Sequence, residues 1–228
     1  PLAYADITYG CYGVWCGLLH IPSHIIPLKD DFTLDPKDYD GLHQTIVIAN
    51  PNAPTGLALP LDQVEALVAS NPGHVVVVDE AYVDFGAASA AALLGRYENL
   101  LVVMTYSKSR SMAGARLGFA LGSRELIADL ERLKYATNPY NVNRLTLRLG
   151  EAAVDSDPYF RANARRIMAT RDKTARALRE MGFRLPDSQA NFLFVTHPRI
   201  DGARLYQKCR ERGILIRHFS DPAIAQYN

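Results

Sequence analysis

Long apolar runs, a dominant charge and paired cysteines are all absent from this chain of 228 residues. No apolar run approaches the roughly 20 residues that a membrane-spanning helix requires, and residues 1–10 have neither the basic nor the apolar region of a signal peptide. The formal net charge of +1 gives no bias toward nucleic acid or an anionic membrane. These features predict an ordinary globular protein with the cytoplasm as its default compartment, and they give no indication of binding to nucleic acid or membrane.

Metal-ligating and disulfide patterns are also absent. Cys11, Cys16 and Cys209 are odd in number and have no C-x-x-C spacing, which argues against a disulfide framework and against a thiolate zinc site. The six histidines are scattered, with no H-E-x-x-H, and no G-x-S-x-G occurs in the chain. We therefore expect no metal site.

Short apolar runs alternate with a helical pattern in the first two thirds of the chain. Residues 44–49, 74–79 and 100–105 are rich in Val or Ile and predict strands buried on both faces, as in a parallel sheet, and 117–121 predicts a fourth strand. Between the first two runs, residues 61–70 have helical spacing and end before Asn71-Pro72-Gly73. The pattern predicts an α/β fold with a mostly parallel sheet flanked by helices.

The last third of the chain has a different character. Asp157 is expected to cap a long helix that Pro158 opens and that ends at Gly182. Two strand-like runs follow, at 191–196 and 214–219, with a helix at 203–212 between them. We therefore expect two domains, a larger one at residues 1–152 and a smaller α+β domain at 153–228.

Four predicted strand ends carry polar groups that could form one site. They are the turn at 50–56 (NPNAPTG), the segment Asp79 to Tyr82, the pair Ser107 and Lys108, and Arg116. Ligands of open parallel sheets bind beyond the carboxyl ends of the strands, so these groups are expected to converge. Each alone could be an ordinary turn, cap or surface charge. A P-loop nucleotide site is excluded because none of the six lysines follows a glycine.

Lys108 has an unusual setting, with serines on both sides and Ala113-Gly114-Ala115 downstream. Residues 105–118 (TYSKSRSMAGARLG) resemble the lysine segment of fold-type I aminotransferases. Residues 76–85 (VVVDEAYVDF) and 50–56 resemble two further segments of that family, in the same order. Residues 6–15 (DITYGCYGVW) and 138–143 (NPYNVN) are most similar to histidinol-phosphate aminotransferases. The resemblance extends over essentially the whole chain.

The resemblance implies pyridoxal 5'-phosphate as cofactor and assigns roles to individual residues. Lys108 would bind the cofactor covalently and then move a proton as general base, and Asp79 would stay ionised beside the ring nitrogen. Tyr82 would hydrogen-bond the ring oxygen. Tyr9 would stack on the ring, although it could equally be a core aromatic. Ser107 and Arg116 would hold the phosphate, with Thr105 in support.

Two departures from the family pattern stand out. The asparagine expected directly before Pro-Thr-Gly is replaced by Ala53, so either Asn52 takes its place or Tyr82 acts alone. The family's phosphate loop and its C-terminal carboxylate-binding arginine have no counterpart in these 228 residues, which suggests a fragment. Arg217 remains as the one arginine that matches a family position for substrate anions.

The resemblance implies transamination of histidinol phosphate with 2-oxoglutarate, in histidine biosynthesis, by a homodimer. Two alternatives stay open at this point. One is a related enzyme of the same cofactor, such as a threonine-phosphate decarboxylase or an aromatic amino acid aminotransferase. The other is a non-enzymatic binding domain of a regulator.

Overall fold

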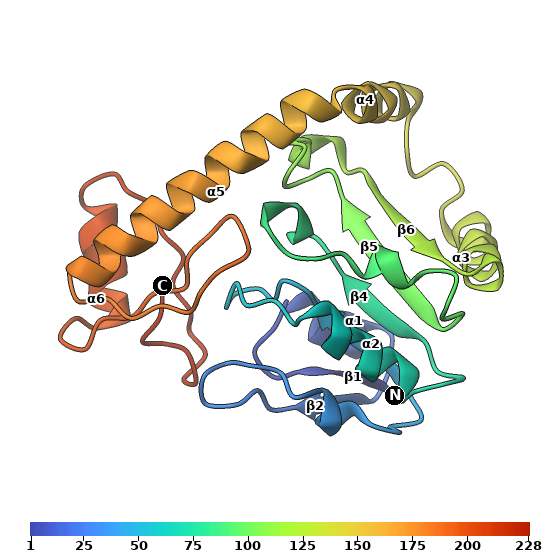
Figure 1. The fold of residues 1–228 in the computed structure, drawn as a ribbon, viewed down its shortest axis with the longest axis horizontal. Coiled ribbons are helices and arrows are strands. Elements are labelled where there is room, and N and C mark those ends of the chain that lie inside the picture. Colours follow the sequence, from blue (N-terminus) through green and yellow to red (C-terminus); the bar gives the residue numbers. More distant parts are fainter.

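A six-stranded sheet forms the centre of the computed structural model, which describes residues 1–228 (Figure 1). Its strand order is β2-β1-β3-β4-β5-β6. The first five strands are parallel, and β6 pairs antiparallel with β5 at one edge. The strands are β1 (Leu2–Ala5), β2 (Ser23–Ile26), β3 (Thr45–Ala49), β4 (Val76–Asp79), β5 (Leu100–Thr105) and β6 (Gly118–Gly122).

Six α-helices and four short 3-10 helices connect and extend the sheet. In Figure 1, α5 runs from α4, beside the sheet, to the C-terminal segments around α6. The α-helices are α1 (Cys11–Leu18), α2 (Leu61–Ala69), α3 (Arg124–Thr137), α4 (Arg144–Asp155), α5 (Asp157–Glu180) and α6 (Gly202–Arg210). The 3-10 helices are η1 (Pro36–Tyr39), η2 (Val83–Phe85), η3 (Ala90–Leu93) and η4 (Ala113–Ala115). None of the helices combines the length and the apolar character needed to cross a bilayer.

The two faces of the sheet pack against different residues. On one face, Val76 and Val78 of β4 are fully buried in the main core with α2, η1 and η3. Side chains alternate along a strand, so Val77 and Asp79 point to the opposite face. There Val77 packs on a smaller cluster of Tyr4, Tyr12, Cys16 and Val47. The alternation of β4 therefore directs Asp79 toward α1 and away from the main core.

The Val-rich runs correctly predicted the central strands of the sheet, whereas the outer strands β1, β2 and β6 differ from the prediction. β5 has the predicted bounds, whereas β3 and β4 begin one and two residues later than predicted. The run at 117–121 forms β6 with a one-residue shift, and it is antiparallel. β1 (LAYA) and β2 (SHII) were not predicted, because these short segments lack the unbroken Val-rich run that marks the equally short β4.

Two expectations for the C-terminal third were wrong. Asp157 does not cap α5: the N-cap is Ser156, which makes no side-chain capping bond, and Asp157 lies in the first turn with its carboxylate paired to Arg161 and Arg110. The runs at 191–196 and 214–219 form no ladder. The backbone pairing there consists of the isolated bridges Arg184–Thr196 and His197–Ile200 and a reciprocal pair of hydrogen bonds between Val195 and Asn228, without the consecutive pairs that make a ladder.

Candidate active site

The carboxyl ends of β3, β4 and β5 lie at the same edge of the sheet. β3 leads into the turn at 50–56, β4 ends at Asp79, and β5 leads into the turn that carries Lys108. The parallel register aligns Asp79 with Ala49 on one side and with Val103 on the other. Strand alignment thus brings together three segments that are far apart in the sequence.

Lys108 lies in a tight turn directly after β5. The turn is closed by two backbone hydrogen bonds, from the Ser111 amide to the Lys108 carbonyl oxygen (3.1 Å) and from the Met112 amide to the Tyr106 carbonyl oxygen (3.0 Å). The ammonium group forms no ion pair and lies 5.1 Å from the centre of the Tyr82 ring. An exposed lysine without a carboxylate partner is available for chemistry at this edge.

Asp79 is held by a tyrosine that the sequence analysis did not single out. The hydroxyl of Tyr12 donates to Oδ2 of Asp79 at 2.8 Å, and the backbone N–H of Ala81 donates to Oδ1 at 3.1 Å. Tyr12 is only 3% exposed, and burial, followed by the charge of Asp79, raises the pKa of its hydroxyl. The phenol therefore stays protonated and remains a donor to the carboxylate.

Tyr82 lies beside Lys108, and Tyr9 lies beside Tyr12. The Tyr82 ring packs edge-on against Phe192 at 5.0 Å between centroids, with the Lys108 ammonium over its face. Tyr9 is 45% exposed and contacts Tyr12 ring to ring at 5.5 Å, so it is not a core residue. The pKa of Tyr9 is raised, first by a hydrogen bond with Cys11, then by burial, with smaller effects from Asp79 and Tyr82. Its exposed ring is free to contact a planar ligand.

Glu80 stabilises the segment that carries Tyr82. Its carboxylate, 2% exposed, accepts hydrogen bonds from the Ser89 hydroxyl and the Ala90 amide, both at 2.6 Å. Burial raises the pKa of Glu80, and these two hydrogen bonds oppose the rise. Glu80 thereby ties the start of the loop after β4 to η3. The sequence pattern did not indicate that Glu80, next to Asp79, would be buried and would hold this loop in place.

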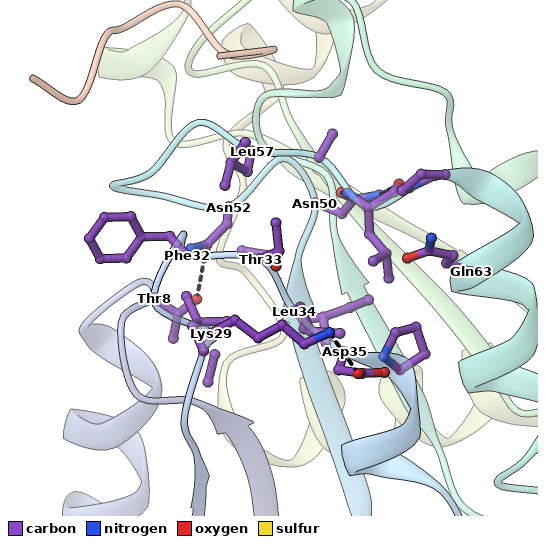
Figure 2. Close-up of a pocket in the computed structure, with 18 of the residues that line it drawn as sticks. Thr8, Lys29, Phe32, Thr33, Leu34, Asp35, Asn50, Asn52, Leu57 and Gln63 are labelled. Carbon is purple, nitrogen blue, oxygen red and sulfur yellow. Dashed lines mark hydrogen bonds and ion pairs between the residues drawn. The ribbon is translucent and has the colours of Figure 1, made fainter. Parts of the chain in front are cut away.

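Asn52 is fully engaged by neighbouring residues. Its Oδ1 accepts from the Thr8 hydroxyl at 2.8 Å (Figure 2). Its Nδ2 donates to the Ile7 carbonyl oxygen at 2.9 Å and to Thr55 Oγ1 at 3.1 Å. These bonds join the turn after β3 to the segment after β1. The amide of Asn52 therefore positions the segment that leads to Tyr9.

Thr105 and Ser107 are part of the framework of the lysine turn. Thr105 Oγ1 accepts from the Ser107 amide at 3.0 Å and donates to the Leu117 carbonyl oxygen at 3.3 Å. Arg116 adopts a left-handed conformation with φ 53°, and its guanidinium donates to the Ala113 carbonyl oxygen at 2.9 Å. The structure thus brings Thr105 and Ser107 into contact, whereas Arg116 is exposed and folded back on its own turn.

Two hollows lie near this edge of the sheet. The first, of 630 Å³, is lined by Thr8, Asn50 and Asn52 and by the ion pair Lys29–Asp35 (Figure 2). It includes neither Lys108 nor Asp79. Two lysines line this hollow: Lys29, paired with Asp35 at 2.8 Å, and Lys37, which forms no ion pair. Neither lies at the strand ends that carry Asp79 and Lys108.

The second hollow is a groove of 1010 Å³ along α5. Arg217, Arg166 and Asn191 line it, together with Ser111 from the lysine turn and Phe192, which packs on Tyr82. Arg217 is exposed and lies 5.8 Å from the Phe219 ring centroid, without a carboxylate partner. The groove therefore extends from the lysine turn to a free guanidinium in the C-terminal third.

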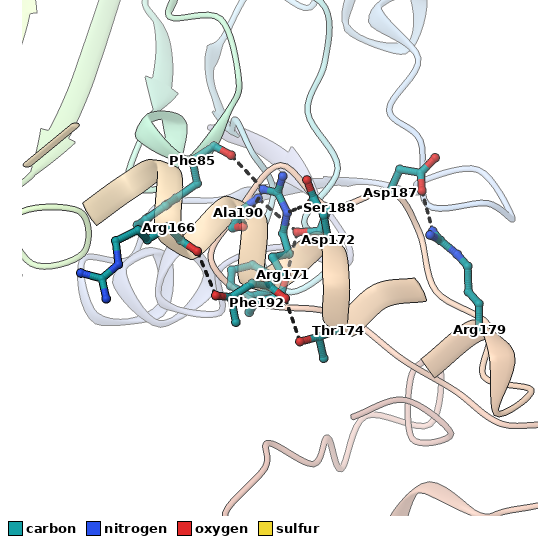
Figure 3. A network of polar contacts seen from close by, with 11 residues as sticks. Phe85, Arg166, Arg171, Asp172, Thr174, Arg179, Asp187, Ser188, Ala190 and Phe192 are labelled. Atoms are coloured by element: carbon teal, nitrogen blue, oxygen red, sulfur yellow. Dashed lines mark hydrogen bonds and ion pairs between the residues drawn. The ribbon is translucent and has the colours of Figure 1, made fainter. Parts of the chain in front are cut away.

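Arg171 joins α5 to the sheet half of the molecule. Its Nη1 donates to the Phe85 carbonyl oxygen at 2.8 Å and to the Ala190 carbonyl oxygen at 3.0 Å, while its Nε pairs with Asp172 (Figure 3). The side chain is largely buried. This arginine fixes the middle of α5 against η2, the short helix that follows Tyr82.

No cluster of three or more His, Cys, Asp or Glu side chains in the chain could hold a metal ion.

Comparison with known proteins gives a consistent picture. The family model for aminotransferase class I and II matches residues 2–227. The chain is 51% identical to histidinol-phosphate aminotransferase 1 of Bordetella parapertussis, over all of this chain and 65% of that protein. It is 47% identical to the histidinol-phosphate aminotransferase of Brachyspira hyodysenteriae, over 98% of this chain and 64% of that protein. The chain thus spans about two thirds of the length of these curated relatives.

Solved structures share the fold. A putative aminotransferase from Burkholderia pseudomallei superposes with a TM-score of 0.83 at 32% identity, over 99% of this chain and 68% of that one. The histidinol-phosphate aminotransferase of Clostridium acetobutylicum gives a TM-score of 0.89 at 21% identity, over 99% and 71%. The L-threonine-O-3-phosphate decarboxylase of Porphyromonas gingivalis gives 0.81 at 21%, over 99% and 70%. At such low identity the last two show the fold alone.

The bond between Tyr12 and Asp79 can be tested by a matched pair of substitutions in the full-length protein. Tyr12→Phe removes a buried donor to a carboxylate and should lower the free energy of unfolding by about 1–3 kcal/mol. Tyr4→Phe, in the same cluster, removes a bond to the neutral Ser23 hydroxyl and should cost less, about 0.5–1.5 kcal/mol. Urea unfolding followed by circular dichroism measures both. Equal losses would mean that the hydrogen bond from Tyr12 to the Asp79 carboxylate stabilises the fold no more than a bond between two neutral hydroxyls.

Proposed function

Because the chain belongs to the aminotransferase class I and II family, we propose that it forms the catalytic part of a histidinol-phosphate aminotransferase. The observation that carries this proposal is the unpaired Lys108 ammonium beside Tyr82, at the strand edge where Asp79 is fixed by Tyr12. The reaction transfers the amino group of histidinol phosphate to 2-oxoglutarate, a step of histidine biosynthesis. Such an enzyme works in the cytoplasm.

Pyridoxal 5'-phosphate is the cofactor of this family, and the residues present fit it. When bound, it supplies an electron sink that stabilises negative charge on the substrate α-carbon. Lys108 provides a free amine for covalent attachment. Asp79 provides a carboxylate whose two oxygens already have one donor each, so its orientation is fixed before the ring nitrogen binds. Neither the Lys108 ammonium nor the Asp79 carboxylate forms an ion pair within the chain.

Each remaining residue has a role that follows from its position. Lys108 moves the proton at the substrate α-carbon as general base once the amine is free. With the cofactor bound, the Tyr82 hydroxyl would donate to the ring oxygen, and Tyr9 would offer its exposed ring for stacking. Because the side-chain hydrogen bonds of Asn52 go to Thr8, Ile7 and Thr55, we assign Asn52 a positioning role and leave the ring oxygen to Tyr82.

Ser107, with Thr105 and Arg116, binds the cofactor phosphate in this proposal. The Ser107 hydroxyl has no hydrogen-bond partner within the chain, and Thr105 fixes the backbone of Ser107. The Arg116 guanidinium is exposed and has only a carbonyl partner, so it can turn toward a phosphate at little cost. In the same scheme residues 1–152 form part of the cofactor-binding domain and residues 153–228 part of a smaller domain.

We also propose a homodimer. The supporting observation is a set of exposed apolar side chains on α1, α3 and the segment through α4, which a single chain leaves in water. They are Val14, Trp15, Leu18, Leu133, Tyr135, Tyr140, Leu145, Leu147 and Leu149. Sedimentation equilibrium of the full-length protein should give twice the mass of one chain. A fully active monomer would overturn this part of the proposal.

Covalent attachment at Lys108 can be tested directly. Full-length protein is loaded with pyridoxal 5'-phosphate, reduced with borohydride to make the linkage permanent, and digested for peptide mapping. We expect the label on Lys108 alone, because it is the lysine at the strand edge beside Asp79 and Tyr82. Lys108→Ala should remove the label and the activity, whereas Lys134→Ala, on exposed α3, should retain both. Label on another lysine would refute the assignment.

Arg217 is proposed to bind the phosphate of histidinol phosphate across the groove. Arg217→Ala removes a charge-assisted contact worth on the order of 1.5–3 kcal/mol, so kcat/KM for histidinol phosphate should fall roughly ten- to hundred-fold. The loss should be much smaller with phenylalanine, which has no side-chain charge. Arg212→Ala, an exposed arginine outside the groove, is the control. Equal losses on both substrates would place Arg217 on a shared group instead.

A further inference from the structure

The two residues that follow Lys108 bond its turn to two other segments. The hydroxyl of Ser109, which is buried, donates to Oδ2 of Asp84 in η2. Arg110 contacts the junction of α4 and α5. The turn that presents Lys108 is therefore fixed to two separate parts of the molecule within two residues of the lysine.

Arg110 makes three different contacts at that junction. Its Nη1 donates to the Ala153 carbonyl oxygen near the end of α4, and its Nη2 lies 3.5 Å from Oδ1 of Asp157 in the first turn of α5. Its guanidinium carbon lies 3.8 Å from the centre of the Phe160 ring. The side chain is 19% exposed, and Phe160 is buried. A planar, largely desolvated guanidinium held on three sides can adopt few other positions.

The contacts of Arg110 differ from those of an ordinary surface ion pair. Arg161 pairs with the same carboxylate, Asp157, one helical turn away, but its side chain is 65% exposed and it forms no hydrogen bond or ion pair with the lysine turn. Surface pairs of this kind contribute little. Substitution of Arg110 therefore removes both the contact with the lysine turn and a charge beside Asp157, whereas substitution of Arg161 removes only a charge beside Asp157.

Further links connect the same three segments. Ser109 joins the lysine turn to η2 through Asp84, and Arg171 joins η2 to the middle of α5 through the Phe85 carbonyl oxygen (Figure 3). Arg110 joins the start of α5 back to the lysine turn. The lysine turn, η2 and α5 thus form a closed set of polar links, in which the position of α5 is coupled to the position of Lys108.

We propose that Arg110 is a positioning residue that holds the Lys108 turn against the α4–α5 junction, and so keeps the lysine amine aligned for proton transfer. The proposal rests on the role assigned to Lys108 above. Proton transfer depends steeply on geometry, so a loosened turn lowers the rate of the chemical step more than it lowers substrate binding. Removal of Arg110 should therefore affect kcat and leave KM nearly unchanged.

Hydrogen–deuterium exchange of the full-length holoenzyme, read on a peptide that covers residues 107–112, tests whether Arg110 orders the turn. Arg110→Ala should raise the exchange rate of this peptide, and lower kcat, by about tenfold each, as expected for loss of a charge-assisted contact. A peptide from β5 serves as internal reference. Arg161→Ala should change neither quantity. Arg110→Lys, which keeps the charge but not the planar fork, should lie between wild type and Arg110→Ala.

Three outcomes would overturn the proposal. The first is unchanged exchange in Arg110→Ala, and the second is faster exchange with unchanged kcat, which would leave Arg110 a purely structural residue. The third is an equal effect of Arg161→Ala, which would assign the result to the charge of Asp157. If Arg110→Ala fails to fold, Phe160→Leu removes the ring under the guanidinium and should show the same pattern more weakly. A borohydride label on a lysine other than Lys108 would instead refute the proposed function, whatever the exchange data show.

Discussion

The parallel alignment of β3, β4 and β5 is the constraint on which the candidate site depends. Parallel strands end at a common edge, so the turn after β3, the carboxylate of Asp79 and the turn of Lys108 meet there without any direct bond between them. The alternation of side chains along β4 then sends Val78 into the main core and Asp79 to the opposite face. A shift of one residue in β4 would exchange these two directions and bury the carboxylate among valines and leucines.

Polar links between distant segments add the precision that strand alignment cannot supply. Asp79 is oriented by Tyr12, 67 residues away in the sequence, and the lysine turn is bonded to Asp84, 25 residues away, and to Ala153, 43 residues away. Each link uses a side chain that is partly or fully buried, where hydrogen bonds to charged groups are stronger than in water. The edge of the sheet therefore carries groups whose orientations are set before any ligand binds, which is the arrangement that catalysis by electrostatic stabilisation requires.

Long-range contacts explain why sequence reasoning found some of these residues and missed others. Lys108 and Asp79 stand next to Val-rich runs, so their place at strand ends could be predicted from local pattern. Tyr12 and Arg110 carry no such local mark, because one is a tyrosine in an apolar helix and the other an arginine in a polar turn. The expected cap at Asp157 was wrong for a related reason: the helix begins at Asp157 itself, after Ser156, and the Asp157 carboxylate pairs with arginines whose approach the local pattern does not show.

The sequence by itself determined the Val-rich central strands, the long helix through residues 157–180, the chemistry-bearing residues at strand ends and the resemblance to one family. Periodicity, turn residues and motif spacing are local properties, and a linear chain displays them directly. Only the tertiary structure decided that β6 runs antiparallel, that the runs at 191–196 and 214–219 remain without a ladder, and that Tyr12 and Arg110 support Asp79 and Lys108. These features depend on which segments pack side by side, and packing is settled by burial and hydrogen bonding across the whole chain.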